Sequence, residues 1–271
     1  MSDDDLAERP VPAPDLQLTY GLGADHLVDV RLPAGTDPAP LVVVVHGGFW
    51  RKAWDRAHAA PQSAALAEAG YVVATVEYHR VGRPGSGWPH TLDDVALMAD
   101  TVPTLVAGSA LDRVDLERIA FVGHSAGGHL VTWLAARHVL PAASPWATAR
   151  PLAGAVVSLA GVVDLALAEQ LGLGDHAAAA LLGGAPDEQP ERYAQADPAR
   201  LLPTGTRTVL VQGLDDDVVP SAVSRSFAAA ARAAGDDVRL HELEGADHDD
   251  VIDPASAAWP AVLAGIAEAL G

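Results

Sequence analysis

Residues 118–130 read RIAFVGHSAGGHL, and this stretch decides how the chain folds. The apolar run up to Val122 predicts a strand, and the residues after Gly127 predict a helix. Between them the pattern G-x-S-x-G places Ser125 on a tight turn that presents a hydroxyl above a sheet. Gly123 and Gly127 are needed because a Cβ at either position would clash where the two backbones approach. We therefore expect Ser125 to be a nucleophile, although the same pattern also occurs in ordinary turns.

Composition narrows the classes of protein to consider. The 271 residues suffice for one large α/β domain or two small ones, and 49% of them are hydrophobic. The absence of cysteine excludes disulfides, thiolate metal sites and a cysteine nucleophile. The formal net charge of −19 argues against nucleic acid or an anionic membrane as a partner, since both need a basic surface. We expect a small-molecule partner instead, and we allow for a homodimer.

The N-terminal residues are acidic where a secretory signal would be basic and then apolar. No apolar run approaches the roughly 20 residues of a membrane span. A cytoplasmic protein is the expectation, with residues 1–14 as a loose N-terminal arm.

Strand and helix patterns alternate along the rest of the chain. Such alternation predicts a mostly parallel central sheet of about eight strands with helices on both faces, in a single α/β domain over residues 1–271. The first two strands are expected to form a hairpin at one edge of the sheet. The expected strands are 16–20, 26–32, 41–45, 71–77, one beginning at 119, 152–159, 206–212 and 238–243. The expected helices are 57–69, 91–107, 130–139, 221–234 and 256–270.

Residues 161–203 interrupt this alternation. Two short helical pieces, 165–171 and 176–182, are followed by a stretch rich in proline, glycine and acidic residues. An excursion from the carboxyl end of a strand would lie over the edge of the sheet where ligands bind. We expect a small cap or pocket wall, with a plain surface connection as the alternative.

A serine nucleophile needs a base, and an acid that orients the base. In α/β-hydrolases the acid and then the base follow the serine along the chain. Residues 215–217, all aspartates, follow an apolar strand and a glycine, so spacing alone leaves the acid open among the three. His248 follows the last strand in a loop, whereas His241 falls within the alternating strand and is expected to pack on a sheet face. His248 is therefore the expected base.

The donors for an oxyanion are expected in two places. The amide of Ala126 follows the nucleophile directly. The second source is the loop 46–50, because its glycines let N–H groups turn inward with no side chain in the way. His46 is expected to steady this loop rather than to transfer protons.

These motifs resemble those of a known group. Residues 46–50, HGGFW, are similar to the H-G-G-x-W loop of kynurenine formamidase-like and carboxylesterase-like enzymes of the α/β-hydrolase superfamily. Residues 123–129, GHSAGGH, match the nucleophile elbow of that group, the strand-to-helix turn that carries the serine. Residues 245–248 match its G-x-x-H base motif. The resemblance extends over essentially the whole chain and implies the α/β-hydrolase fold. Phe49 stands where relatives of hormone-sensitive lipase have glycine, which fits the formamidase-like group better.

The resemblance also implies roles for individual residues. The acid motif H-G-x-x-D-x-x-V-P aligns from Gln212 onward and implies that Asp216 is the acid. Gln212 replaces the first histidine of that motif, a departure that we expect to affect the support of the turn rather than the acid. The amides of Gly48 and Phe49 would complete the oxyanion hole with Ala126.

A Ser-His-Asp hydrolase of this group acts without a cofactor on a carboxylic ester or a small amide, such as an N-formyl aryl amine. The alternatives are an arylformamidase or peptidase-like specificity on the same three residues, and a non-catalytic binding protein with this fold. A metal site is a further alternative, but the histidines near the serine and near residue 248 lack a helical ligand pattern.

Tryptophans near the predicted strand ends suggest an aromatic pocket. Trp50 and Trp88 are the expected substrate-binding residues, with Phe49 and Trp54 beside them. The alternative is that Trp54 and Trp88 pack the edges of helices.

Overall fold

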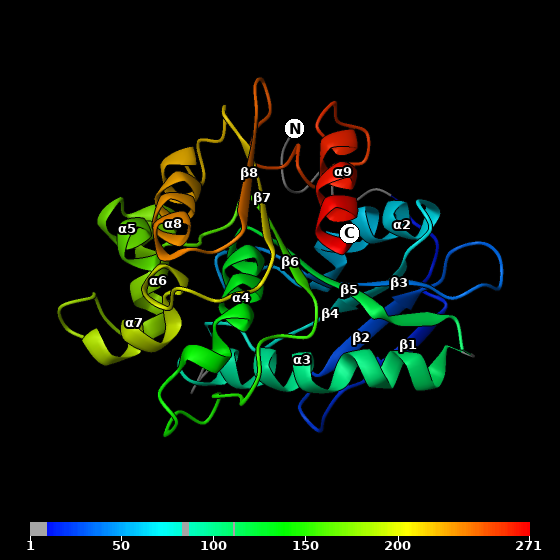
Figure 1. Ribbon diagram of the computed structural model, residues 1–271, viewed down its shortest axis with the longest axis horizontal. Helices are drawn as coiled ribbons and strands as arrows, with labels where there is room; N and C mark the ends of the chain where they lie inside the picture. The colour runs from blue at the N-terminus through cyan, green and yellow to red at the C-terminus, as the bar shows by residue number, and fades with distance from the viewer. Residues whose placement is uncertain (1–9, 83–86, 111) are drawn as a thin grey trace.

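A computed structural model describes residues 10–82, 87–110 and 112–271. Its centre is one eight-stranded sheet with the order β1-β2-β4-β3-β5-β6-β7-β8 (Figure 1). Pairs β1/β2 and β2/β4 are antiparallel and all other neighbours are parallel, so the expected edge hairpin and the mostly parallel sheet are both confirmed. The strands are β1 Leu16–Thr19, β2 Leu27–Arg31, β3 Ala39–Val45, β4 Val72–Val76, β5 Val114–His124, β6 Ala155–Leu159, β7 Thr208–Gly213 and β8 Val238–Leu243.

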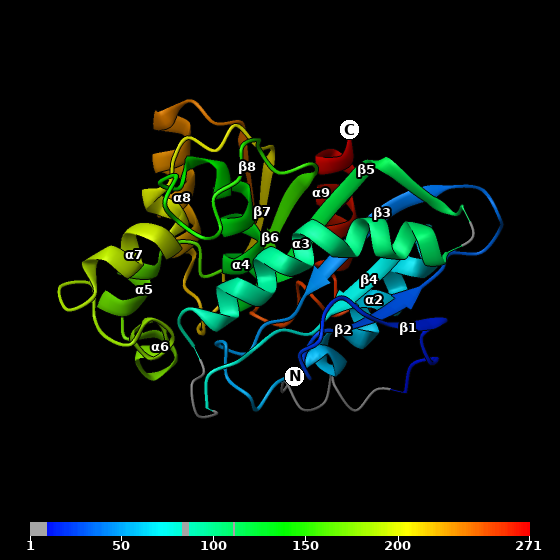
Figure 2. The same cartoon turned by 90° about the horizontal axis from the view of Figure 1, so that it is seen from below.

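Helices cover both faces of the sheet, and each face has its own apolar core. The central strand β3 shows this directly, because Val43 faces one cluster and Val42 and Val44 face the other. The helices α3 His90–Ser109, α4 Ala126–Ala135 and α8 Ser221–Ala234 lie on the first face. The helices α2 Ala60–Glu68 and α9 Trp259–Leu270 lie on the second. Figure 2 views the sheet from the side of α3.

Residues between β6 and β7 form the expected excursion, at the left of Figure 1. It contains three α-helices rather than two: α5 Leu165–Gln170, α6 Leu173–Leu182 and α7 Pro190–Ala196. Buried Leu165, Leu181 and Tyr193 join the same core as α4, so the excursion is packed onto the body of the protein. The first turn of α6 is not a normal helix, because Gly174, Asp175 and His176 all have left-handed φ angles near 56°.

The remaining short helices are η1 Arg56–Ala59, η2 Arg137–Val139 and η3 Pro198–Arg200. Of the N-terminal arm, residues 1–9 lie outside the described residues. Residues 10–14 have no helix or strand, and Arg31 donates a 2.7 Å hydrogen bond to the carbonyl oxygen of Pro12. Every helix in the described ranges is too short or too polar to cross a lipid bilayer.

Candidate active site

Ser125 stands between the last residue of β5 and the first residue of α4. Its backbone angles, φ 52° and ψ −116°, are those of a sharp turn. A Cβ on Gly123 would lie closer than 3.0 Å to the backbone of Gly127, and one on Gly127 would be equally close to that of Val45. The expected clash of strand with helix is thus found at Gly123, whereas at Gly127 the clash is with the neighbouring strand β3. The expected exposure is not found, since only 3% of Ser125 is accessible because the loop after β3 closes over it.

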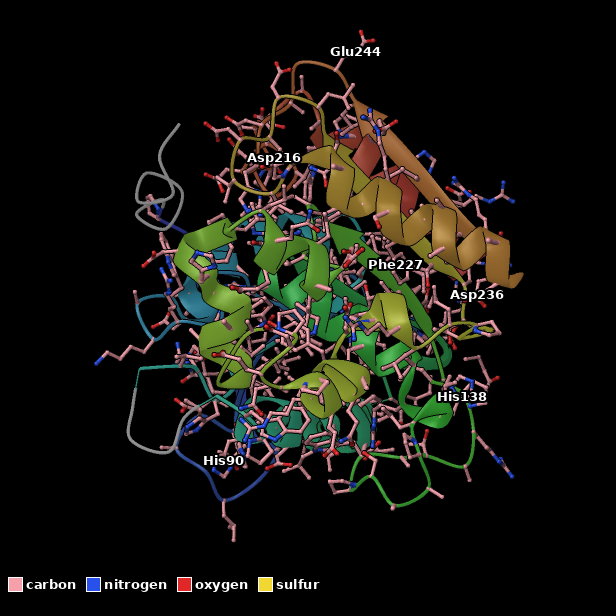
Figure 3. The ribbon with its side chains drawn as sticks, turned by 90° about the vertical axis from the view of Figure 1, so that its left-hand side faces the viewer. His90, His138, Asp216, Phe227, Asp236 and Glu244 are labelled. Carbon is pink, nitrogen blue, oxygen red and sulfur yellow. The ribbon has the colours of Figure 1, made fainter. Side chains whose placement is uncertain are left out.

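Asp216 and His248 come from the loops after β7 and β8, which end at the same edge of the sheet. Figure 3 labels Asp216. The Nδ1 atom of His248 lies 2.8 Å from Oδ2 of Asp216, and both residues are buried. The other carboxylate oxygen accepts hydrogen bonds from the amides of Val218 and Val219, at 2.9 and 2.7 Å. Four polar contacts in all, counting that of Gln212 below, hold this carboxylate in one orientation.

The competing candidates lie elsewhere. Asp215 and Asp217 are exposed on either side of Asp216. His241 lies on β8, as expected, and pairs with Glu268 of α9 at 2.7 Å.

Gln212 corrects one expectation. Its buried amide nitrogen donates to Oδ2 of Asp216 at 3.0 Å, so this residue contacts the acid itself and does more than support the turn. The same nitrogen also donates to the carbonyl oxygens of Gly213 and Val219, both at 3.1 Å. Ser224 of α8 fixes the other end of the amide, since its hydroxyl donates to Oε1 at 2.7 Å.

His124, which sequence analysis did not single out, supports the loop of His248. Its Nε2 lies 3.0 Å from the carbonyl oxygen of His248, and the two rings are 4.6 Å apart. Burial, followed by the nearby charges of His248 and His58, lowers the pKa of His124 well below its usual value. The ring is therefore neutral and donates from Nε2 to that carbonyl. The two histidines are 124 residues apart in the chain, so no local pattern reveals the contact.

The loop after β3 turns sharply around two residues that are not glycine. Phe49 and Trp50 have φ angles of 48° and 56°, and the amide of Arg51 closes the turn on the carbonyl oxygen of Gly48 at 2.9 Å. Such left-handed residues are strained and tend to occur at functional sites. The amides of Gly48, Phe49 and Ala126 donate to no other residue in the described ranges, so they are available to a ligand.

Trp50 does not occupy the expected place. Trp50 has no accessible surface, because its left-handed backbone turns the ring into the core, where it packs edge-on against His129 at 5.2 Å. This tryptophan cannot line a pocket in this conformation. Trp88 is half-buried and packs edge-on against Trp146 at 4.9 Å, in line with the packing alternative. Trp54 lies against the turn instead, since a Cβ on Gly48 would meet its side chain.

The first turn of α6 contacts this loop. A Cβ on Gly174 would lie 2.6 Å from the ring of Phe49, so the ring packs directly on that glycine.

Across residues 10–82, 87–110 and 112–271, no group of three or more His, Cys, Asp or Glu side chains could hold a metal ion.

Comparison with known proteins gives a family and confirms the fold. The BD-FAE family model matches residues 28–230. Esterase LipQ of Mycobacterium tuberculosis is 28% identical over 249 residues, covering 89% of this chain and 58% of that protein. Esterase LipC of the same organism is 30% identical over 258 residues, covering 88% of this chain and 60% of that protein. The chain thus spans about three fifths of the length of these relatives.

Among solved structures, the thermophilic esterase Est2 of Thermogutta terrifontis has a TM-score of 0.70 at 23% identity, over 93% of this chain and 90% of that one. At this identity the likeness concerns the fold, and it agrees with the α/β-hydrolase fold expected from the sequence.

Proposed function

The chain belongs to the BD-FAE family, and from that premise we propose that it is a serine esterase that cleaves a carboxylic ester through an acyl-enzyme. The observation that carries the proposal is the buried 2.8 Å contact between His248 and Asp216, at the sheet edge that also bears Ser125. The proposed substrate is a small molecule, and the enzyme needs no cofactor to cleave an ester in this way.

In the proposed mechanism His248 is the general base. Because Nδ1 of its ring donates to Asp216, Nε2 is left without a proton and can accept the proton of Ser125. No hydrogen bond joins Ser125 to His248 among the residues that the structure describes. Catalytic hydrogen bonds are often long in the free enzyme and shorten when substrate binds. We expect the same here when the serine attacks the carbonyl carbon.

The amides of Gly48, Phe49 and Ala126 would stabilise the tetrahedral oxyanion. The proposal is supported by their lack of other acceptors in the described ranges and by their positions on two loops that converge at Ser125. His248 would then return its proton to the leaving alcohol, and water would hydrolyse the acyl-enzyme by the same route.

A second candidate is hydrolysis of an N-formyl aryl amine on the same three residues. The observation that favours it is the sequence HGGFW at residues 46–50, with its resemblance to formamidase-like enzymes. The names of the relatives LipQ and LipC favour esters, which is why the ester is the first candidate.

The test compares Ser125→Ala with Ser158→Ala, a nearby serine whose buried hydroxyl has no hydrogen-bond partner in the described ranges. Both variants are assayed with p-nitrophenyl esters, with N-formylkynurenine and with a fluorophosphonate probe. We expect Ser125→Ala to lose turnover and labelling and Ser158→Ala to retain both. Turnover that survives in Ser125→Ala rejects the proposal. Turnover of the formyl amide alone selects the second candidate.

A further inference from the structure

His46, at the end of β3, is a buried histidine whose two ring nitrogens both face oxygen. Nε2 lies 2.8 Å from Oε1 of Glu77, and Nδ1 lies 2.8 Å from the carbonyl oxygen of Gly47. The side chains of His46 and Glu77 are only 1% and 2% exposed, so water competes for neither contact.

These two contacts decide how many protons the ring carries. A carbonyl oxygen and a carboxylate can only accept, and a neutral imidazole has one N–H to donate. Both contacts can therefore be hydrogen bonds only if the ring of His46 is protonated on both nitrogens, or if Glu77 itself holds a proton.

The surroundings of Glu77 favour the carboxylate. Burial alone would raise the pKa of Glu77, but the hydrogen bond and charge of His46, the guanidinium of Arg80 and the amide of Arg56 together hold that pKa below its usual range. Arg80 lies 3.3 Å from Oε1, and the amides of Tyr78 and Arg56 donate to the carboxylate at 3.0 Å each. Glu77 is thus a carboxylate, and hydrogen bonds at both ring nitrogens of His46 then require an N–H on each of them.

Arg80 is the other cation at this carboxylate, and Oε1 of Glu77 faces both it and His46. The Tyr78 ring stacks on the imidazole at 4.5 Å, and burial raises its pKa, so it is neutral. His124 on β5 is neutral for the reason given above. Glu77 is therefore the counter-ion of His46.

The contact of Nδ1 with the Gly47 carbonyl also fixes the orientation of the Gly48 amide. That carbonyl and the amide of Gly48 belong to the same planar trans peptide, so the C=O and the N–H point in opposite directions. Tyr78 fixes the preceding peptide as well, because its hydroxyl donates to the carbonyl oxygen of His46 at 3.0 Å. Two successive peptides are held in this way, and the N–H of Gly48 faces away from His46.

We propose that His46 is a positioning residue for the oxyanion hole: as an imidazolium paired with Glu77, it holds the Gly47–Gly48 peptide so that the Gly48 amide points at the oxyanion. The inference rests on the proposed function, because the Gly48 amide matters only if an oxyanion forms beside Ser125. It adds a charged residue pair, remote from the reacting atoms, on which the reaction depends.

Glu77→Gln tests the proposal through kinetics. Without its counter-ion the His46 imidazolium loses a proton as the pH rises, and one of the two hydrogen bonds is lost with it. We expect kcat to fall about 10- to 100-fold while KM changes less than about twofold, as for an interaction made only in the transition state. The kcat profile should also gain a fall at alkaline pH that the unmodified protein lacks. An unchanged kcat and an unchanged profile overturn the proposal.

Asp94→Asn is the matched control. It breaks another part-buried pair, His26 with Asp94 at 2.8 Å, whose carboxylate also accepts from the amide of His79. Among the described residues, no hydrogen bond or ion pair joins this pair to the loop at residues 46–48. We expect its profile and its kcat to match those of the unmodified protein. An alkaline fall in this variant too would mean that any lost histidine–carboxylate pair produces the effect, which rejects a special role for His46.

Nitrogen-15 NMR of the imidazole groups at pH 8 tests the protonation state without any substitution in the pair. Two N–H signals for His46 are expected, assigned through contacts with the stacked Tyr78 ring, and one signal overturns the proposal. The same spectrum of Ser125→Ala separates the hypothesis about His46 from the proposed function. If that variant kept its turnover, the proposed function would fail, and the spectrum would still decide the state of His46.

Discussion

Arg51 donates a hydrogen bond from Nη2 to the carbonyl oxygen of Gly174 and so ties the loop after β3 to the first turn of α6. A second, longer contact from the same nitrogen reaches the carbonyl oxygen of Asp175 at 3.4 Å. With the Phe49 ring packed on Gly174, the excursion between β6 and β7 is attached to the loop that carries the proposed oxyanion donors. A change in the excursion should therefore alter the reaction as well as the pocket.

Gly174→Ala and Gly172→Ala test this attachment. Both glycines have left-handed φ angles, 56° and 67°, so either alanine should lower the free energy of unfolding by about 1–2 kcal/mol. Only at Gly174 would the new methyl group also displace Phe49, because at Gly172 the nearest atom is 3.6 Å away. We expect kcat for p-nitrophenyl esters to fall in Gly174→Ala alone. Urea unfolding and ester hydrolysis measure the two effects, and equal activity of the variants contradicts the attachment.

Gln212→Leu should lower kcat for p-nitrophenyl esters. The leucine removes the 3.0 Å hydrogen bond to Asp216, so the carboxylate that orients His248 is held less firmly. Loss of a buried hydrogen bond of this kind also lowers the free energy of unfolding by about 1–3 kcal/mol. Ser224→Ala is the control, since it removes the hydroxyl behind the amide and leaves the donor to Asp216 in place. A kcat that falls in both variants, or in neither, rejects a direct effect of Gln212.

Gly123→Ala and Gly108→Ala should change stability in opposite directions. A methyl group at Gly123 collides with the backbone of Gly127, and we expect a loss of about 3 kcal/mol or more in the free energy of unfolding. A methyl group at Gly108, in α3, would have no other atom within 4 Å. Alanine there should add about 0.5–1 kcal/mol, because it favours the helix. Thermal unfolding followed by circular dichroism measures both, and a stable Gly123→Ala would mean that the elbow can widen.

Asp197 should make stability depend on pH between about 4 and 6. Burial, with a smaller contribution from Asp164, raises the pKa of Asp197 from 3.8 to about 6, although the amides of Leu165, Ala166 and Ala199 partly offset it. The folded protein keeps this proton to higher pH than the unfolded chain does. The stabilisation is therefore full below about pH 4 and is lost as the pH rises through 6.

Asp197→Asn cannot titrate, so comparison with the unmodified protein isolates this effect. The free energy of unfolding of the asparagine variant, relative to that of the unmodified protein, should rise between pH 4 and pH 6 by at most about 3 kcal/mol. Urea unfolding at several pH values measures the difference. A difference that stays constant with pH contradicts the assignment.

The parts of the fold that the sequence predicted are those encoded locally. Apolar runs and glycine turns located all eight strands and the elbow at Ser125. The limits of β5 were wrong, because it begins at Val114 and not at Ile119. Its polar start is held by pairing with Ala39 and Pro40 of β3, and such distant pairing leaves no mark in the local pattern.

The residues around the site were harder to foresee for the same reason. His124 and Glu77 act through partners that the fold brings together from distant parts of the chain. Gln212 contacts Asp216 only 4 residues away, but the local pattern does not show that its amide reaches the carboxylate. Trp50 was placed wrongly because a left-handed tryptophan is uncommon, and no neighbouring residue signals that its side chain will turn inward. The order of serine, acid and base could be predicted from the sequence, whereas the residues that hold them in place by hydrogen bonds could not.

The excursion leaves from β6 and returns to β7, and these two strands are direct neighbours in the sheet. Because the two strands are parallel, the excursion leaves at the carboxyl end of β6 and enters at the amino end of β7, and backbone hydrogen bonds fix both points whatever lies between them. A segment of different length could be grafted between the same two strands with a small change in loop-closure entropy and no change in strand register. We therefore expect that a replacement segment can change the substrate selectivity, provided that it again supplies a carbonyl oxygen for Arg51 and a flat surface for Phe49.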